Sequence, residues 1–227
     1  MPDRPYTVLS CAISVDGCLD DTGPDRLILS GPEDLDEVDE LRASVDAILV
    51  GAGTIRADNP RLLVRSPARI ARRVARDLPA HPLRVTMTRS GDLDPSARFF
   101  TGPGQFLVYE NAALEAVLFD LAKRSAATLL IEGGAEVLTA ALSAGLADEL
   151  RLAVAPFFVG GATAPRFALP ATYPHDATSP MRLHGARQLG HVAVLTYRLT
   201  GRARPPGLPA TGSPAGGQWA TGDDSGG

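Results

Sequence analysis

Apolar residues along this 227-residue chain fall into two kinds of segment, short continuous runs and runs with helical spacing. The continuous runs are typical of β-strands because they are mostly apolar and bounded by Gly, Pro or Asp. They lie at residues 6–15, 47–50, 83–88, 106–109, 128–131, 150–154 and 191–199. Helical segments separate several of them, and this alternation predicts an α/β fold with a central, mostly parallel β-sheet flanked by helices.

Three helices are predicted from apolar spacing and end signals. One begins at Ser30, an N-cap residue followed by a proline in the first turn, and carries Leu35, Val38 and Leu41 on one face. The second spans residues 112–125. The third spans residues 135–145 and ends with Gly145 as its C′ residue. The Arg- and Pro-rich residues 66–82 have no clear period, so no element is predicted there.

Composition narrows the classes of function. With 22 basic and 26 acidic side chains, the net charge is −4, which disfavours binding to nucleic acid or to an anionic membrane. No apolar run approaches the roughly 20 residues of a membrane span, and the N-terminus lacks a hydrophobic signal segment. Cys11 and Cys18 are too few for a zinc site or a disulfide scaffold. We therefore expect a cytoplasmic protein without a bound metal.

The last 27 residues differ from the rest of the chain. Residues 201–227 contain 8 Gly and 4 Pro and a single aromatic residue, Trp219. Such a segment cannot bury enough apolar surface to offset the entropy lost on ordering it. The sequence therefore predicts a folded domain over residues 1–200 and a disordered tail over 201–227.

Two predicted strands end in glycines, in the segments Val50–Thr54 and Ile131–Gly134. In open α/β sheets, ligands bind outside the carboxyl ends of the strands, and glycines there let the backbone approach a phosphate closely. A tight turn is the alternative for either segment alone. The first is not a dinucleotide-binding G-x-G-x-x-G motif, because Arg56 occupies the sixth position, and no Gly-Lys-Ser/Thr follows to make a P-loop.

Two arginines are candidates for holding a substrate phosphate. Arg42 precedes the strand at 47–50 and Arg65 follows the loop after it, so both can converge at one edge of the sheet. Arg69 and Arg72 are interpreted as surface charges. The four histidines suggest no Ser-His-Asp set, and the H-x-E and P-C-x-x-C motifs of zinc deaminases are missing.

Seven short motifs then occur in an order that resembles one family. They are S-x-D-G at Ser14–Gly17, L-R-A at Leu41–Ala43, V-G-A-G-T at Val50–Thr54, A-D-N-P-R-L-L-V-R at Ala57–Arg65, I-E-G-G-A at Ile131–Ala135, G-L-A-D-E-L at Gly145–Leu150 and A-P-F-F-V-G-G at Ala155–Gly161. The chain resembles, over residues 5–200, the reductase domain of bifunctional riboflavin-biosynthesis deaminase–reductases and the free-standing pyrimidine reductases of the same family. Each motif is weak alone, but seven in order are specific.

The resemblance implies a dihydrofolate-reductase-like fold, a homodimer and an activity. That activity is the NADPH-dependent reduction of the ribose of 5-amino-6-(5-phosphoribosylamino)uracil to a ribityl chain. The family pattern assigns the dinucleotide to Ile13, Gly51, Ala52, Gly53, Thr54, Asp58, Gly133, Gly134, Ala135, Glu136, Val137, Leu138 and Thr139. It places Asp16 near the nicotinamide, the substrate phosphate on Arg42, Arg65 and the Leu62 backbone, and the pyrimidine against Glu132.

The proton donor is left open by the sequence. Asp16 and Glu132 are the acidic candidates at strand ends, and a water molecule is the alternative.

Two departures from the family pattern bear on the substrate. The deaminase domain is not in this sequence, so a separate deaminase is expected to supply the substrate. The segment 20–29 also differs, with Arg26 and Ile28 near positions where family members bind substrate and cofactor. Reduction of a pterin or of a specialised-metabolism pyrimidine is therefore an alternative. A non-catalytic NADP-binding partner of a deaminase is another, although such a protein has no use for a second phosphate clamp at Arg42 and Arg65.

A subunit interface is also expected from one segment. Residues 145–159 are too apolar for an edge strand that faces water. We expect a partner subunit to cover part of this segment.

Overall fold

The computed structural model describes residues 4–23, 25 and 27–209, so Arg26 and residues 210–227 of the predicted tail lie outside the described residues. The strands are β1 (Tyr6–Ser14), β2 (Ala47–Gly51), β3 (Leu83–Thr88), β4 (Phe106–Glu110), β5 (Thr128–Gly133), β6 (Glu149–Ala155), β7 (Arg182–Leu189) and β8 (Val192–Arg198). The helices are α1 (Pro32–Ser44), α2 (Ala52–Asp58), α3 (Pro67–Val74), α4 (Arg98–Thr101), α5 (Leu114–Lys123) and α6 (Ala135–Ser143).

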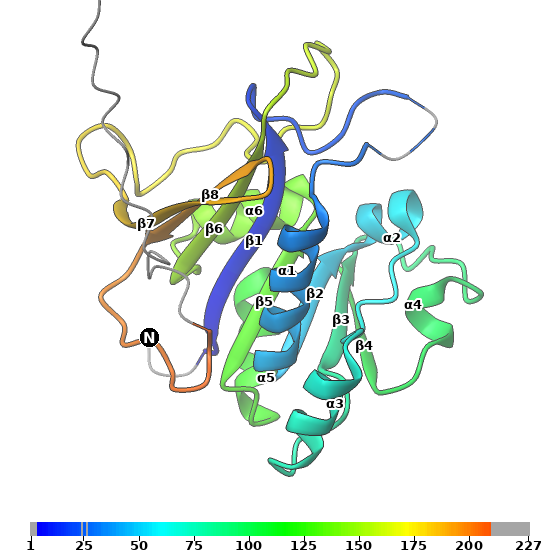
Figure 1. The fold of residues 1–227 in the computed structure, drawn as a ribbon. Helices are drawn as coiled ribbons and strands as arrows, with labels where there is room; N and C mark the ends of the chain where they lie inside the picture. The colour runs from blue at the N-terminus through cyan, green and yellow to red at the C-terminus, as the bar shows by residue number, and fades with distance from the viewer. Residues whose placement is uncertain (1–3, 24, 26, 210–227) are drawn as a thin grey trace, which may run out of the picture.

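All eight strands form one sheet in the order β4-β3-β2-β5-β1-β6-β8-β7 (Figure 1). The first six strands of this order pair in parallel, and β8 and β7 add an antiparallel pair at the edge. Helices α1 and α3 cover one face, and α5 and α6 cover the other (Figure 1). The predicted α/β class, with a mostly parallel sheet flanked by helices, is confirmed.

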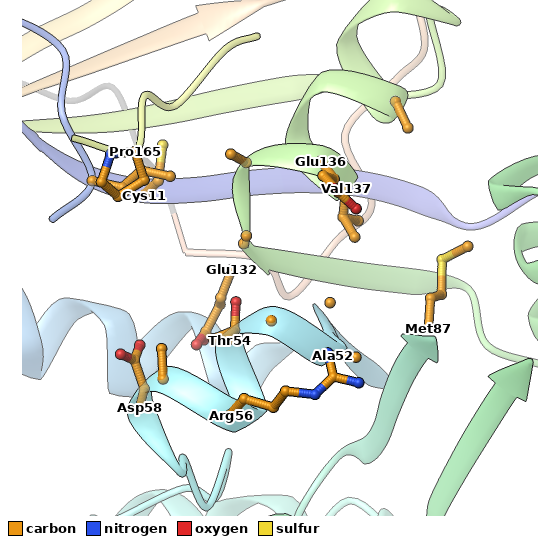
Figure 2. A pocket seen from close by; sticks show the side chains of 18 of the residues that line it. Cys11, Ala52, Thr54, Arg56, Asp58, Met87, Glu132, Glu136, Val137 and Pro165 are labelled. Atoms are coloured by element: carbon orange, nitrogen blue, oxygen red, sulfur yellow. The ribbon is translucent and has the colours of Figure 1, made fainter. Parts of the chain in front are cut away.

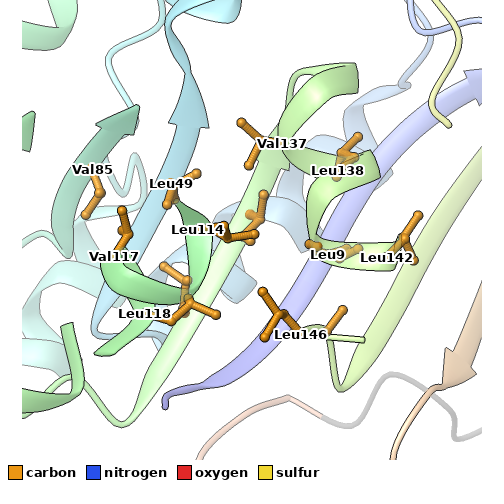
Figure 3. Close-up of a cluster of buried hydrophobic side chains, with 14 of the residues drawn as sticks. Leu9, Leu49, Val85, Leu114, Val117, Leu118, Val137, Leu138, Leu142 and Leu146 are labelled. Atoms are coloured by element: carbon orange, nitrogen blue, oxygen red, sulfur yellow. The ribbon is translucent and has the colours of Figure 1, made fainter. Parts of the chain in front are cut away.

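The core forms on both faces of the sheet because the central strands are apolar on both sides. On the side of α5 and α6, leucines and valines of these helices pack on β1, β2 and β5 (Figure 3). On the opposite side, Leu41 of α1, Ile48 and Val50 of β2, Phe99 of α4 and Leu208 form a second cluster. Strand β2 is completely buried, and the glycine-containing loop that follows it is therefore held at a defined place.

Helix α1 differs from its prediction in its start and in its buried face. Gly31 occupies the N-cap position instead of Ser30. Leu35 is 41% exposed, whereas the side chains of Asp34 and Asp39 are buried. The predicted apolar face is therefore wrong at this position. Burial of the carboxylates is possible because each pairs with an arginine from β6 or α3.

The Arg- and Pro-rich segment, for which the pattern predicts no element, contains helix α3. Arg69 and Arg72 face the acidic side of α1; Arg72 pairs with Glu40, and Arg69 pairs with Asp36, Asp39 and Glu40 at 2.7–3.0 Å. The Arg69 side chain is only 16% exposed, so its interpretation as a free surface charge is wrong. The pattern also misses α2, α4 and β7, because short elements of mixed polarity give no resolvable period.

The position of β6 in the sheet contradicts the assumption, made for residues 145–159, that this segment is an edge strand. The strand lies between β1 and β8 and is not an edge of the sheet. Its apolar residues are buried within the same chain, with Leu150 2% exposed and Ala153 completely buried. The apolar composition of β6 is thus explained without a partner subunit, but Phe158, which follows the strand, is 74% exposed, so a partner subunit that covers this end of the segment stays a prediction.

The first nine residues of the predicted tail pack against the domain, which moves the domain boundary. In residues 201–209, Arg202 Nη1 lies 3.0 Å from Asp148 Oδ2 and Arg204 Nε lies 2.9 Å from Glu149 Oε2. Both carboxylates are buried, so these arginines compensate charges that would otherwise be costly. The prediction of disorder from residue 201 is wrong for this stretch. Within the residues that the structure describes, no helix has the length and hydrophobicity needed to cross a membrane.

Candidate active site

One cavity opens where the carboxyl ends of the parallel strands meet. Its volume is about 1280 Å³, above the roughly 300–1,000 Å³ common for one small ligand, so two ligands can fit side by side. Figure 2 shows its wall around α2, the end of β5 and the start of α6, with Cys11 and Pro165 at one end and Met87 at the other. The topology explains this place, because parallel strands leave a crevice beyond their carboxyl ends.

Glycines at the ends of β2 and β5 form a cradle in the cavity wall. A Cβ added to Gly134 would stand 3.1 Å from the hydroxyl oxygen of Thr54, and one added to Gly51 would stand 3.1 Å from Val137 Cγ2. Gly133 has a φ of +130°, a conformation that side chains other than glycine's rarely adopt. The cradle leads directly into the N-terminus of α6, whose free N–H groups favour a phosphate. These features fit a dinucleotide.

Most residues predicted to bind the dinucleotide line this cavity. Those in the wall are Gly51, Ala52, Gly53, Thr54, Asp58, Gly133, Gly134, Ala135, Glu136 and Val137. Ile13, Leu138 and Thr139 are not in the wall, so the structure does not bring these three to the site. Ile13 and Leu138 are buried in the core, and the Thr139 hydroxyl accepts the N–H of Leu169 at 2.9 Å. On β1 the wall is formed instead by Cys11 and Ala12.

The wall also contains residues that the sequence analysis missed. They lie at the end of β3 and just after it, and between β4 and the first turn of α5, and comprise Met87, Thr88, Arg89, Ser90, Asn111, Ala112, Ala113, Leu114 and Glu115. Both strands were predicted from the sequence, and in the parallel sheet β3 pairs with β2 and β4 with β3, so their carboxyl ends lie at the same edge as that of β2. The order of the strands in the sheet was the missing information.

Glu132 is held in the cavity by Arg42. Arg42 Nε and Nη2 donate to the two carboxylate oxygens at 2.7 and 2.6 Å, a bidentate pair that fixes the carboxylate. Burial lowers the pKa of the Arg42 guanidinium, but the charge and hydrogen bonds of Glu132 outweigh burial and raise this pKa. Glu132 lines the cavity and points toward α2 (Figure 2). The pair therefore presents an oriented acceptor whose charge is compensated.

Asp16 is not in the cavity wall. Its carboxylate accepts hydrogen bonds from the Ser14 hydroxyl at 2.5 Å and from the N–H groups of Val159 and Gly160 at 3.0 and 2.8 Å. The Ser14 bond and then the two backbone bonds hold the Asp16 pKa far below its usual value. A carboxyl group that remains ionised near neutral pH cannot donate a proton, so the structure does not support Asp16 as the proton donor. It joins the loops that follow β1 and β6.

Arg65 and Leu62 lie on the segment beside this pair. The Arg65 side chain is 55% exposed, and its Nη2 donates to the carbonyl of Leu35, a residue of the cavity wall, at 2.6 Å. The Leu62 side chain is buried in the core while its φ is +51°. Arg42 Nη1 reaches the carbonyl of Leu63 at 3.5 Å. Arg65 belongs to the segment that Arg42 contacts at Leu63, so the structure brings the two arginines near each other. Neither forms part of the cavity wall.

The end of the cavity near β1 is mostly apolar. Leu27, Ile28 and Leu29 from the loop before α1 line it, and Asp20 Oδ1 fixes that loop by accepting the N–H of Leu27 at 3.0 Å. Ile28 is 79% exposed at the cavity mouth. Burial raises the pKa of the Cys11 thiol to about 12, so Cys11 contributes an uncharged wall.

Comparison with known proteins identifies relatives along nearly the whole domain. Residues 5–195 match the family described as the RibD C-terminal domain. A 2,5-diamino-6-ribosylamino-4(3H)-pyrimidinone 5′-phosphate reductase from Archaeoglobus fulgidus is 32% identical over 186 residues, covering 71% of this chain and 85% of that protein. RibD from Acinetobacter baumannii superposes with a TM-score of 0.74 at 26% identity, over 87% of this chain and 58% of that one.

A more distant structure bears on the fold alone. Dihydrofolate reductase from Enterococcus faecalis, complexed with NADP(H), superposes with a TM-score of 0.54 at 16% identity, over 85% of this chain and 95% of that one. The expected dihydrofolate-reductase-like fold is therefore confirmed. The resemblance inferred from seven motifs is confirmed as well, and the chain belongs to the RibD C-terminal domain family.

Proposed function

We propose that this protein is an NADPH-dependent reductase that converts the ribose of 5-amino-6-(5-phosphoribosylamino)uracil to the ribityl chain in riboflavin biosynthesis. One observation carries the proposal: a single cavity joins a glycine cradle suited to a dinucleotide with an oriented Glu132. Hydride transfer needs the two ligands held in contact and shielded from water, and one cavity for both meets that need.

The cofactor takes the end of the cavity formed by the glycine cradle and the ends of β3 and β4. Bound NADPH supplies the hydride. Arg56 and Arg89 are exposed arginines of the cavity wall, and Arg89 pairs with Glu136, which is also exposed. Because surface pairs of this kind are weak, Arg89 can exchange its carboxylate for the extra phosphate of NADPH. These two cations support NADPH in preference to NADH.

The substrate takes the end near β1 and α1. The substrate phosphate extends past the cavity wall to Arg65, which contacts the wall residue Leu35, and to the remaining donors of Arg42, while Glu132, fixed by Arg42, accepts hydrogen bonds from the pyrimidine. Opening the sugar ring requires a proton on the departing oxygen. Because Asp16 lies outside the cavity and Glu132 is paired with an arginine, we assign this proton to a water molecule.

A second candidate substrate differs in one substituent of the ring. The name of the Archaeoglobus relative specifies a 2,5-diaminopyrimidinone, which carries an amino group where the uracil carries an oxygen. Deamination converts the first form to the second, so a deaminase acts before this enzyme if the uracil is its substrate. We also propose a homodimer, as the resemblance implies, and a cytoplasmic location, as expected from the composition.

The test is NADPH oxidation, followed by absorbance, with the uracil substrate, its 2-amino counterpart and dihydrofolate. The proposal expects turnover with one or both ribosylaminopyrimidines and a higher kcat/KM with NADPH than with NADH. Efficient turnover of dihydrofolate alone would assign the chain to pterin reduction. Tight NADPH binding without turnover of any of the three would favour the non-catalytic alternative. Light scattering of the purified protein tests the dimer.

A further inference from the structure

Asp39 on α1 holds the backbone on both sides of the Arg65 carbonyl. Its Oδ1 accepts the N–H of Arg65 at 2.6 Å, and its Oδ2 accepts the N–H of Ser66 at 3.1 Å. The carboxylate is 2% exposed, and Oδ2 also accepts from Arg69 Nη1 at 3.0 Å. A buried carboxylate with three donors has one orientation, so the backbone that it binds is fixed as well.

Asp39 and Arg42 lie three residues apart on α1 and therefore project from the same side of the helix. Asp39 binds the backbone of Arg65, and Arg42 binds Glu132 and approaches the Leu63 carbonyl. One face of one helix thus sets the relative position of both arginines and of the acceptor in the cavity. No other described carboxylate binds the Arg65 backbone.

We propose that Asp39 is a positioning residue for binding of the substrate phosphate. It acts through Arg65: by binding the Arg65 backbone, it fixes the position from which the Arg65 side chain extends, relative to Arg42. This inference rests on the proposed function, in which the two arginines bind one phosphate. A phosphate contact of two arginines depends on their separation, and a displacement of about 1 Å can cost up to roughly 100-fold in rate.

The electrostatics keep Asp39 charged while it holds the Arg65 backbone. The backbone hydrogen bonds from Arg65 and Ser66 and the pairing with Arg69 outweigh burial and keep the Asp39 pKa low, so the carboxylate is ionised when the substrate binds. Arg69 compensates this charge from the α3 side. The Arg65 guanidinium is half-exposed, with Nε 3.6 Å from Asp39 and Nη2 donating to the Leu35 carbonyl, so its exposed edge can still receive an anion.

The experiment compares Asp39→Asn and Asp39→Ala with Asp36→Asn, a control for the pairing with Arg69 at a more exposed carboxylate. Asp36 is on the same helix face and also pairs with Arg69, but it makes no contact with the Arg65 backbone. We expect the Asp39 variants to raise KM for the phosphorylated pyrimidine about tenfold, because one oriented contact to the phosphate is lost. The change in kcat should be less than about twofold. The rise in KM should be larger for Asp39→Ala than for Asp39→Asn, because asparagine retains one carbonyl acceptor. The control should match the wild type.

Three further measurements separate positioning from scaffold loss. With the dephosphorylated substrate, the Asp39 variants should match the wild type, since no phosphate remains to be positioned. In an Arg65→Ala background, Asp39→Ala should add little, because both changes remove the same contact. Calorimetric affinity for NADPH should stay unchanged in all variants.

Several results would overturn the inference. Equal losses with phosphorylated and dephosphorylated substrate, or an equal loss in Asp36→Asn, would reduce Asp39 to a structural link between α1 and α3. If the wild type does not oxidise NADPH, calorimetric binding of the phosphorylated pyrimidine replaces KM as the readout. Binding that is present but independent of Asp39 would refute this inference alone. Absence of both turnover and binding would refute the proposed function, and this inference with it.

Discussion

Gly134 offers the sharpest test of where the dinucleotide binds. Its φ is −83°, a value that residues other than glycine also adopt, so glycine is not required there for a left-handed conformation. The added Cβ would lie 3.1 Å from the Thr54 hydroxyl oxygen, a few tenths of an ångström closer than ordinary contact. The surrounding wall belongs to a cavity of about 1280 Å³, so the Thr54 side chain has space into which it can move.

The expected result is a loss of cofactor binding with little loss of stability. Gly134→Val places two further methyl groups in the cradle, where they would push a bound phosphate away from the backbone. The displaced phosphate would lose at least one charge-assisted hydrogen bond, worth roughly 1.5–3 kcal/mol. We therefore expect the Kd for NADPH to rise about 10- to 150-fold by isothermal calorimetry. The melting temperature of the ligand-free protein should fall by no more than a few degrees, about 1 kcal/mol of unfolding free energy.

Two controls isolate the cofactor from the protein contact. Gly161→Ala creates a similar 3.3 Å contact, with Ala164 Cβ, outside the cavity wall, and should leave the Kd unchanged. Gly134→Val combined with Thr54→Ala removes the contact within the protein and should restore stability; its affinity is compared with that of Thr54→Ala alone, because Thr54 also lines the cavity. An affinity for NADPH within about threefold of the wild type, 0.7 kcal/mol, would refute the assignment of this loop to the dinucleotide.

The remaining predictions concern one charge pair, one loop and the chain end. Arg42→Ala leaves Glu132 unpaired, so we expect at least a tenfold loss in kcat/KM in steady-state kinetics; a change below threefold would contradict this role. Asp16 has a lowered pKa, so its stabilisation is present above the unfolded pKa of about 3.9 and is lost as the pH falls below it. The thermal destabilisation caused by Asp16→Asn should therefore be measurable at pH 7 and shrink in acid; a pH-independent difference would argue against it. Deleting residues 201–227 should lower the melting temperature more than deleting 210–227, because only the longer deletion removes the arginines that pair with buried carboxylates.

The end of α6 illustrates what local sequence could predict. Gly145, expected as the C′ residue, has a φ of +64°, and the helix itself ends at Ser143. The positions of the central strands were predictable for a similar reason, since a strand buried on both faces must be apolar throughout. Glycines at the strand ends and the order of seven motifs then pointed to the dinucleotide cradle and to the family.

Local sequence could not predict which charges are buried. Asp34, Asp39 and Arg151 look like surface residues, yet each is at most 2% exposed because a partner from another element neutralises it. The same holds for the C-terminal segment, whose Gly- and Pro-rich composition predicts disorder although Arg202 and Arg204 bind carboxylates of the domain. Pairing partners far apart in sequence leave no local signal.

The sequence by itself therefore determined the fold class, the family and the glycine cradle, because these depend on short-range patterns of apolar residues and on backbone freedom at single positions. Only the tertiary structure decided which polar residues line the cavity and which form internal contacts. It placed Asp16 in a loop junction, paired Arg42 with Glu132, and brought the ends of β3 and β4 into the cavity wall. The physical reason is that the role of a charge depends on its partners and burial, and both follow from the order of strands in the sheet.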